Sequence, residues 1–302
     1  MVQPNGSACR EVRSPIVINW HVTEACNYRC AYCYAHWDRP QGDEIIRIPQ
    51  ATEALVRSIH EAFSTGITSE RLRLNFAGGE PLLFAKQVLA AMKFAAGLGF
   101  DLSLITNGSR LSRQVVSEFA PLLKVLGVSL DADGDPANMA IGRADSRGRP
   151  SPVRLLPEMI AFARAVNPQL TIKINTVVNA INWQLDLSAM IERLNPDQWK
   201  VLRMLPSTTR HLEVTKEQFE SFLKRHARFR SLMRVEDNDA MVESYVMVDP
   251  HGRFFQNGQR GFGYAYSAAI LDVGARDAFR AVTWVADKFA ARYESPTVDV
   301  AQ

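Results

Sequence analysis

The sequence lacks any long hydrophobic run. No apolar stretch approaches the roughly 20 residues that a membrane-spanning helix needs, and the N-terminal stretch MVQPNGSACREVRSP has no apolar core like that of a secretory signal peptide. An excess of one charge is also missing, because the formal net charge is only +3, which is too small to argue for a nucleic-acid partner. We therefore expect a protein that binds neither a membrane nor nucleic acid directly.

Cysteine is scarce as well. Only four are present; three of them lie between Cys26 and Cys33, and none follows Cys33. Such a clustered set does not suit a disulfide framework, which staples distant parts of a chain together. It indicates a reducing compartment, and we expect the cytoplasm.

The three clustered cysteines are Cys26, Cys30 and Cys33, in the pattern CxxxCxxC. A tight loop with this spacing can aim three thiolates at three irons of a cuboidal iron–sulfur cluster. The remaining cysteine is Cys9, outside the motif, so one iron of such a cluster would stay open to another ligand. The alternatives are a zinc site, which normally closes with a second pair of ligands, and three buried thiols. The spacing favours the cluster.

Strands and helices are expected to alternate from Ile16 onward. The expected strands are short and rich in Val, Ile, Leu or Phe, as parallel strands covered by helices are: Ile16–Val22, Leu72–Ala77, Leu102–Thr106, Val125–Leu130, Leu170–Val178 and Trp199–Leu205. The expected helices span about Gln50–Ser64, Leu83–Leu98, Arg110–Leu123, Pro152–Val166 and Gln184–Leu194. Six such units predict an α/β fold, a parallel barrel or a doubly wound sheet, with the working face at the carboxyl ends of the strands. The cysteine loop follows the first strand and should lie at that face.

The chain is less regular after about Pro206. We expect a helix at Thr215–Arg230, a hairpin made of Val242–Val248 and Arg253–Gln256, a short segment Ile270–Val273 and a helix around Arg276–Tyr293. The resulting organisation is a flexible lead-in over residues 1–14, the barrel over 15–210, and an extension over 211–302 that packs on the barrel rather than folding alone.

A second motif, Asn75-Phe76-Ala77-Gly78-Gly79-Glu80-Pro81, follows the second strand. Gly78 and Gly79 would let the backbone approach a ligand closely. Glu80 offers a carboxylate that could pair with an ammonium group, and Pro81 suits a first helical turn. Taken alone, the motif is equally typical of an ordinary strand-to-helix turn.

The CxxxCxxC loop and the Gly-Gly-Glu-Pro turn together resemble the radical S-adenosylmethionine (SAM) enzymes. The resemblance implies a partial (βα)6 barrel and a [4Fe–4S] cluster on Cys26, Cys30 and Cys33, with SAM on the open iron. When reduced, such a cluster cleaves SAM to a 5′-deoxyadenosyl radical that abstracts hydrogen from the substrate. The residues that would contact SAM are Gly78, Gly79 and Glu80 at its methionine end, Tyr32 at adenine, and Asn107 and Ser129 at ribose and methionyl groups. Without the resemblance, Asn107 is a turn asparagine and Ser129 a core-facing serine.

Polar residues share one face of several expected strands, because residues two apart in a strand point the same way. Asn19 shares a face with His21, Arg73 with Asn75, and Lys173 with Asn175. Lys200 lies on the face opposite that of Trp199 and Val201. Helices should cover the apolar faces, so the polar faces should point into the barrel. Unpaired burial of three cations would cost several kcal/mol each, and these strands carry no matching acids. The pattern predicts a multiply charged anion such as a triphosphate; the alternative is that the lysines lie at solvated strand ends.

A closer resemblance is to the viperin family. It rests on Ile18–Thr23 leading into the cysteine loop, and on seven further segments: Asn75–Pro81, Thr106–Ser109, Ile141–Arg143, Ile172–Asn179, Leu194–Val201, Ser244–Asp249 and Ile270–Gly274. These segments run from about residue 16 to 280. On them the chain is identified as a prokaryotic member of the viperin family.

That resemblance implies a reaction. A nucleoside triphosphate binds in the barrel, the radical takes its ribose 4′ hydrogen, and the 3′ hydroxyl leaves as water; one electron and one proton complete a 3′-deoxy-3′,4′-didehydro nucleotide. Such a chain terminator serves antiviral, here antiphage, defence. By position, the triphosphate contacts are Asn19, Arg73, Lys173, Asn175, Lys200 and the C-terminal Arg260, while Arg143 joins the SAM contacts and Tyr245 assists the final reduction or proton transfer. An electron donor of the flavodoxin or ferredoxin type and a monomeric state are expected, and the base (CTP, UTP or GTP) stays open.

Some positions depart from the family pattern. Ala77 replaces a serine, Gln198 replaces an arginine, and Arg73 stands where animal viperins tend to have lysine. Two alternatives remain. One is another radical SAM enzyme, of the molybdopterin-precursor or peptide-modifying type, which normally carries additional C-terminal cysteines. The other is a non-catalytic nucleotide-binding homologue, which the intact cysteines and Gly-Gly-Glu turn oppose.

Overall fold

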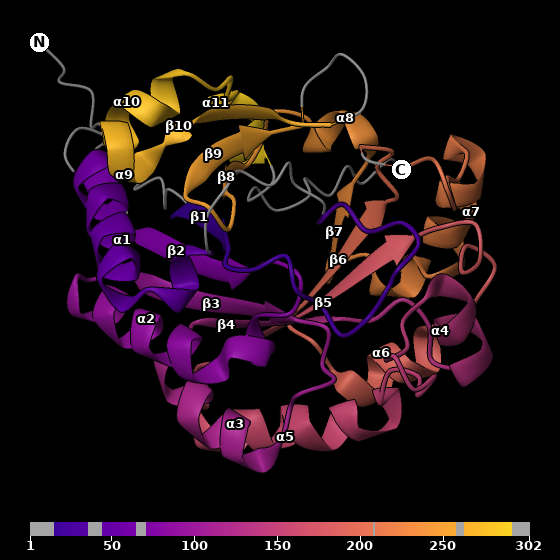
Figure 1. Cartoon of the computed structure of the whole chain (residues 1–302). Coiled ribbons are helices and arrows are strands. Elements are labelled where there is room, and N and C mark those ends of the chain that lie inside the picture. The colour runs from indigo at the N-terminus through magenta and orange to yellow at the C-terminus, as the bar shows by residue number, and fades with distance from the viewer. Residues whose placement is uncertain (1–14, 36–43, 65–70, 208, 258–262, 292–302) are drawn as a thin grey trace, which may run out of the picture.

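One ten-stranded sheet organises the chain (Figure 1). The computed structural model describes residues 15–35, 44–64, 71–207, 209–257 and 263–291. Seven strands are parallel neighbours in chain order: β1 (Ile16–His21), β2 (Leu72–Ala77), β3 (Asp101–Thr106), β4 (Val125–Ser129), β5 (Thr171–Val178), β6 (Gln198–Arg203) and β7 (Met233–Glu236). β8 (Val246–Val248) pairs in parallel with β1, and β9 (Arg253–Gln256) and β10 (Ala265–Ala269) continue antiparallel. The sheet ends at β10 and β7, so the expected partial barrel is confirmed as an open one.

The strands form where apolar and polar residues alternate. Ile18 and Trp20 in β1, Ile174 in β5 and Trp199 in β6 are fully buried, whereas their neighbours Asn19 and Lys173 keep some exposure. The buried faces lie under helices α1 (Pro49–Ser64), α2 (Ala85–Gly97), α3 (Arg113–Phe119), α5 (Leu156–Val166), α6 (Ser188–Leu194) and α7 (Lys216–Arg225), arranged around the outside of the sheet in Figure 1. The apolar face is therefore outward and the polar face inward, as the alternation predicts.

Local signals in the sequence set several helix ends. Ser112 caps α3 by accepting from the Val115 N–H at 3.2 Å. α7 begins with a capping box between Thr215 and Gln218. Gly142 ends α4 (Asp135–Ile141) in a left-handed conformation, with φ +89°.

The extension joins the sheet at both edges instead of only packing on it. β7 lies against β6, and the β8–β9 hairpin with β10 lies against β1. Helices α9 (Ile270–Val273) and α10 (Ala275–Arg280) pack on α1, where the Ala275 N–H donates to Ser58 Oγ at 3.0 Å. The remaining short helices are α8 (Asn238–Met241) and α11 (Ala286–Ala291). The hairpin prediction is confirmed with a shorter first strand, β8. Where one helix around Arg276–Tyr293 was predicted, the described residues form α10 and α11. The elements β7, β10, α4 and α8 were not expected from the sequence.

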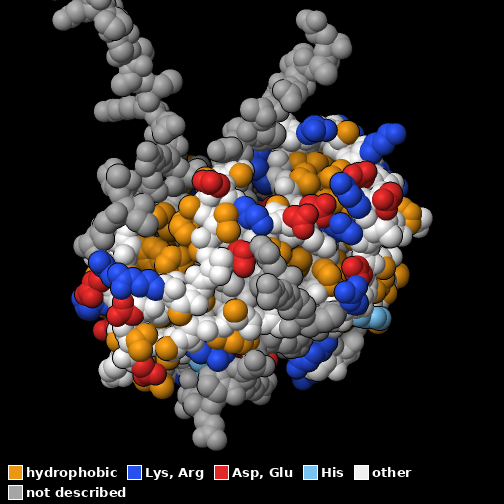
Figure 2. All heavy atoms as spheres, turned by 90° about the horizontal axis from the view of Figure 1, so that it is seen from above, with side chains coloured by type: hydrophobic (Ala, Val, Ile, Leu, Met, Phe, Trp, Pro, Cys, Tyr) orange, Lys and Arg blue, Asp and Glu red, His pale blue; other side chains and the backbone are white. Residues whose placement is uncertain are grey.

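The described surface carries both signs of charge. Figure 2 shows Lys, Arg, Asp and Glu side chains interspersed on one face, in keeping with the net charge of +3. None of the described helices has the length and apolarity to cross a bilayer.

Candidate active site

The cysteine loop follows β1 at the carboxyl edge of the sheet. Its three cysteines form no disulfide and are partly exposed. Backbone N–H groups point at two of the sulfurs, from Tyr28 to Cys26 Sγ and from Ala35 to Cys33 Sγ, each at 3.4 Å. Burial raises the pKa of all three thiols, that of Cys30 to about 12. Binding of iron to them as thiolates must therefore release protons.

Two glycine contacts hold this loop against the rest of the site. Gly79 donates its N–H to Thr23 O at 2.7 Å, and a Cβ there would lie 2.2 Å from Ala25 O. A Cβ on Gly142 would lie 2.1 Å from Arg29 O. The glycines thus allow backbone segments to touch the cysteine loop itself. The sequence motif had suggested a close approach to a ligand; in the described structure the close approach of Gly79 is to the loop.

Glu80 is fully buried at the end of β2. Its Oε1 accepts from the Leu82 N–H at 3.0 Å and the Thr106 hydroxyl at 2.8 Å, and its Oε2 accepts from the Asn107 N–H at 2.7 Å. Burial raises the pKa of this carboxyl, and these three bonds oppose the rise. A carboxylate has about four acceptor positions, so Oε2 keeps room for one more donor, which suits an ammonium group.

Asn107 links Glu80 to the cysteine loop. Its Nδ2 donates to Asn27 Oδ1 at 3.0 Å and approaches Cys26 Sγ at 3.8 Å. Its Oδ1 accepts from the Ser109 N–H at 2.9 Å. The side chain therefore makes both the turn contact expected of an Asn-Gly pair and a contact with a predicted cluster ligand.

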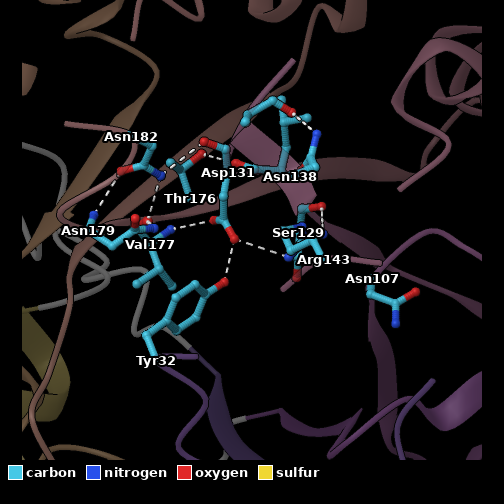
Figure 3. A network of polar contacts seen from close by, with 12 residues as sticks. Tyr32, Asn107, Ser129, Asp131, Asn138, Arg143, Thr176, Val177, Asn179 and Asn182 are labelled. Atoms are coloured by element: carbon cyan, nitrogen blue, oxygen red, sulfur yellow. Dashed lines mark hydrogen bonds and ion pairs between the residues drawn. The ribbon is translucent and has the colours of Figure 1, made fainter. Parts of the chain in front are cut away.

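A buried acid that sequence reasoning missed, Asp131, collects several predicted site residues (Figure 3). Its Oδ2 accepts from the Tyr32 hydroxyl and from Arg143 Nη1 at 3.1 Å, and its Oδ1 accepts from the Val177 N–H at 2.9 Å. Arg143 Nη2 also donates to Ser129 O at 2.7 Å. Asp131 is the second residue after β4 and is 1% exposed. In the sequence Asp131 stands in a loop and belongs to no local motif, so nothing distinguished it from other loop aspartates.

Arg143 retains one buried donor. Its side chain is 3% exposed, and among the described groups its Nε has no hydrogen-bond partner. Its position beside Tyr32 and Ser129 would direct that donor to an acceptor such as a carboxylate.

Polar side chains form two rows on the inner face of the sheet. In one row, Ser103 donates to Asn75 at 2.7 Å, Asn75 donates to Asn19 at 2.9 Å, and Asn19 donates to Val246 O at 3.2 Å. In the other, Ser129, Asn175 and Lys200 are register partners across β4, β5 and β6. The first row is therefore linked from β3 to β8 by its own hydrogen bonds.

The second row is open to a ligand. Asn175 is 9% exposed, and its buried Nδ2 has no hydrogen-bond partner among the described residues. Lys173 lies two residues earlier on the same face, and Arg73 lies at the amino end of β2; both are partly exposed. Arg260 lies outside the described residues.

Lys200 has an acidic partner that was not anticipated. Its Nζ lies 2.7 Å from Glu236 Oε1 and 2.7 Å from the Tyr245 hydroxyl, which in turn donates to Glu236 Oε2. Glu236 lies on β7, a strand that was not among those expected from the sequence. Unpaired burial of Lys200 is therefore not an argument for an anion.

The residues present fit a cuboidal cluster and SAM. Three thiols come from one loop with N–H groups aimed at two of their sulfurs, and Glu80 and Arg143 keep spare acceptor and donor capacity for an amino acid group. In the described part of the chain, no three His, Cys, Asp or Glu side chains converge as a single metal-ion site. A cuboidal cluster does not require such convergence, because it presents a different iron to each thiolate.

Comparison with known proteins defines the class. Residues 20–151 match the Radical SAM superfamily. The fold resembles anSMEcpe with bound AdoMet, with a TM-score of 0.64 at 15% identity over 89% of this chain and 81% of that one. It also resembles coproporphyrinogen III oxidase from Escherichia coli, with a TM-score of 0.56 at 12% identity over 86% and 68%. The fold and the cysteine loop are those of a radical SAM protein.

Sequence relatives define the family. Proteins named S-adenosylmethionine-dependent nucleotide dehydratase are 39% identical in Psychrobacter lutiphocae, over 94% of this chain and 96% of the relative, and 39% identical in Pseudoalteromonas ulvae, over 93% of each. A relative in Danio rerio is 29% identical over 88% of this chain and 74% of its own length. The chain belongs to this viperin-like family, as the sequence motifs predict. Its cofactors are accordingly SAM and a [4Fe–4S] cluster.

Proposed function

We propose that this enzyme dehydrates a nucleoside triphosphate to its 3′-deoxy-3′,4′-didehydro analogue. The observation that carries the proposal is the order of groups along the strands. Arg73 and Lys173 lie near the amino ends of β2 and β5, whereas the cysteine loop and Glu80 lie beyond the carboxyl ends. From Arg73 to Ala77 the strand rises by about 13 Å. A nucleotide whose phosphates contact these cations therefore directs its ribose toward the loop.

The proposed roles follow this order. Cys26, Cys30 and Cys33 hold the cluster; Gly78, Gly79, Glu80, Tyr32, Asn107, Ser129 and Arg143 hold SAM; and Asn19, Arg73, Lys173, Asn175, Lys200 and Arg260 hold the nucleotide. When bound, the cluster and SAM supply a 5′-deoxyadenosyl radical that takes the 4′ hydrogen of ribose. Tyr245 assists departure of the 3′ hydroxyl as water. The extension completes the nucleotide site, because Tyr245 and Glu236 both belong to it and both contact Lys200.

We also propose the cellular setting. The electron comes from a donor of the flavodoxin or ferredoxin type, and the enzyme acts as a cytoplasmic monomer in antiphage defence. A chain terminator made from a nucleotide pool would stop a phage polymerase, which is the chemical reason for the last proposal. Which of CTP, UTP and GTP is used is left to experiment.

The test is SAM cleavage by the reduced, cluster-loaded protein. We expect formation of 5′-deoxyadenosine to rise when the correct triphosphate is added, and mass spectrometry to show a nucleotide product with the net loss of one water. CTP, UTP and GTP assayed side by side would also identify the base. If no nucleoside triphosphate stimulates cleavage, the proposed reaction is wrong.

A further inference from the structure

Lys200 on β6, Glu236 on β7 and Tyr245 just before β8 form a closed triangle of hydrogen bonds. Lys200 Nζ donates to Glu236 Oε1 and to the Tyr245 oxygen, each at 2.7 Å, and the Tyr245 hydroxyl donates to Glu236 Oε2. The side chains of Lys200 and Glu236 are only 14% and 5% exposed. Nζ also lies 4.9 Å from the centre of the Tyr245 ring. The triangle therefore places one cation against one anion in a largely buried position.

A bound triphosphate would compete with the Lys200–Glu236 ion pair. If its oxygens approach Lys200, they compete with Glu236 for the ammonium group and bring further negative charge beside the carboxylate. A nearby like charge raises the pKa of a carboxyl, and partial burial strengthens the effect. Protonation of Glu236 removes the conflict while preserving its hydrogen bond with Tyr245.

Charged groups that neighbour Glu236 make contacts of their own. Asp237 is paired with Arg203 at 3.1 Å. Arg234 lies two residues before Glu236, in register with Lys200, and its Nη1 donates to Met233 O at 2.9 Å. Lys200 is bonded directly to Glu236, at 2.7 Å.

We propose that Glu236 takes up a proton when the nucleoside triphosphate binds and returns it through Tyr245 during dehydration, so that Glu236 is a positioning and proton-storing residue. The inference rests on the proposed function. As the C3′–O bond breaks, the Tyr245 proton moves to the departing oxygen to give water, and the Glu236 proton moves to the Tyr245 oxygen. One electron from the external low-potential donor completes the C3′=C4′ double bond. Glu236 is then again paired with Lys200, so its carboxylate stays unprotonated until the next nucleotide binds.

The first test is calorimetric titration of cluster-loaded protein with CTP, UTP or GTP, with SAM but without reductant, at pH 7 in buffers of different ionisation enthalpy. We expect wild type to take up about one proton more per bound nucleotide than Glu236→Gln. The variant should still bind, because it keeps Lys200 and loses a negative charge. Glu220→Gln, at an exposed position of α7, is the matched control and should behave as wild type.

The outcomes separate the two proposals. If Glu236→Gln takes up as many protons as wild type, the inference is wrong while nucleotide binding stands. If none of the three nucleotides binds to wild type, the proposed function fails, and the inference fails with it.

The second test is the ratio of didehydro product to 5′-deoxyadenosine during turnover. Glu236→Gln, which cannot store this proton, should still cleave SAM, but its dehydration should slow by about 100-fold. The ratio of didehydro product to 5′-deoxyadenosine should therefore fall, while the KM for the nucleotide does not rise. Tyr245→Phe should lower the ratio in the same way and yet retain proton uptake, because Glu236 is intact. An unchanged ratio in both variants would overturn the relay.

Discussion

Asp131 and Arg143 form an ion pair of 3.1 Å beside the cysteine loop, with side chains only 1% and 3% exposed. Asp131 also accepts from the Tyr32 hydroxyl, and Ala31 in the same loop donates its N–H to Ile141 O at 2.9 Å. One carboxylate thus connects the cysteine loop with the ends of β4 and β5 (Figure 3). Its loss should affect both stability and the geometry of the site.

Asp131→Asn tests this ion pair. The substitution leaves the Arg143 cation buried without its counterion, so we expect a loss of about 3–5 kcal/mol in the free energy of unfolding. Denaturant titration would measure it. Asp277→Asn is the control: it also breaks an Asp–Arg pair, but one whose side chains are 66% and 73% exposed, so the change should stay below about 1 kcal/mol. Equal losses in the two variants would contradict a special role for Asp131.

Gly79→Ala tests the contact between the Gly-Gly-Glu turn and the cysteine loop. The added Cβ would lie 2.2 Å from Ala25 O, so one of the two backbones must move, at a cost of about 1–3 kcal/mol. We expect less iron and sulfide per chain after anaerobic reconstitution. Gly97→Ala adds a Cβ with nothing within 4 Å and should load normally. Full loading of Gly79→Ala would show that the contact is not needed.

The inner sheet could be predicted from the sequence because its strands carry strong local patterns. Leu72–Ala77 was predicted with the bounds that β2 has, and the inward face of Asn19, Lys173 and Asn175 followed from alternation alone. The edges could not be predicted so well. β7 reads Met-Arg-Val-Glu, which is too short and too charged to stand out, and its formation depends on pairing with β6.

The missing parts of the site have the same cause. Glu236 was overlooked because it belongs to β7, and so Lys200 was treated as a cation without an acid. Asp131 was overlooked because no local pattern tells that a loop aspartate will meet Tyr32 and Arg143, residues of two other segments. Motifs whose residues lie close together in one loop were recognised; contacts assembled by the fold from distant segments were not.

The pH dependence of stability offers a third prediction through His21, which is 3% exposed between the rings of Tyr34 and Phe255. Burial lowers the pKa of His21 to about 3, against about 6.5 in an unfolded chain. Between pH 3 and pH 6.5 the unfolded chain binds a proton at His21 that the folded chain does not bind. The contribution of His21 to stability is therefore complete above pH 6.5 and declines as the pH falls toward 3. At pH 5 this amounts to about 2 kcal/mol.

His21→Phe should remove that part of the acid sensitivity. We expect wild type to lose about 2 kcal/mol more than the variant between pH 7.5 and pH 5, measured as the free energy of unfolding in denaturant. His226, whose pKa burial also lowers, is present in both proteins and cancels. Parallel pH curves would mean that His21 does not stay neutral in the folded protein.

Lys173→Ala provides the fourth prediction and separates nucleotide binding from cluster assembly. Lys173 lies on the inner face of β5, two residues before Asn175 and away from the cysteine loop at the carboxyl ends. Loss of one charge-assisted bond to a phosphate should weaken nucleotide binding by about 10- to 100-fold, with iron content unchanged. Lys93→Ala, on the exposed side of α2, removes the same charge elsewhere and should leave the Kd as in wild type. Both variants change the net charge equally. A higher Kd in Lys173→Ala alone would locate the phosphates on the inner face of the sheet, whereas equal Kd values would remove Lys173 from the nucleotide site.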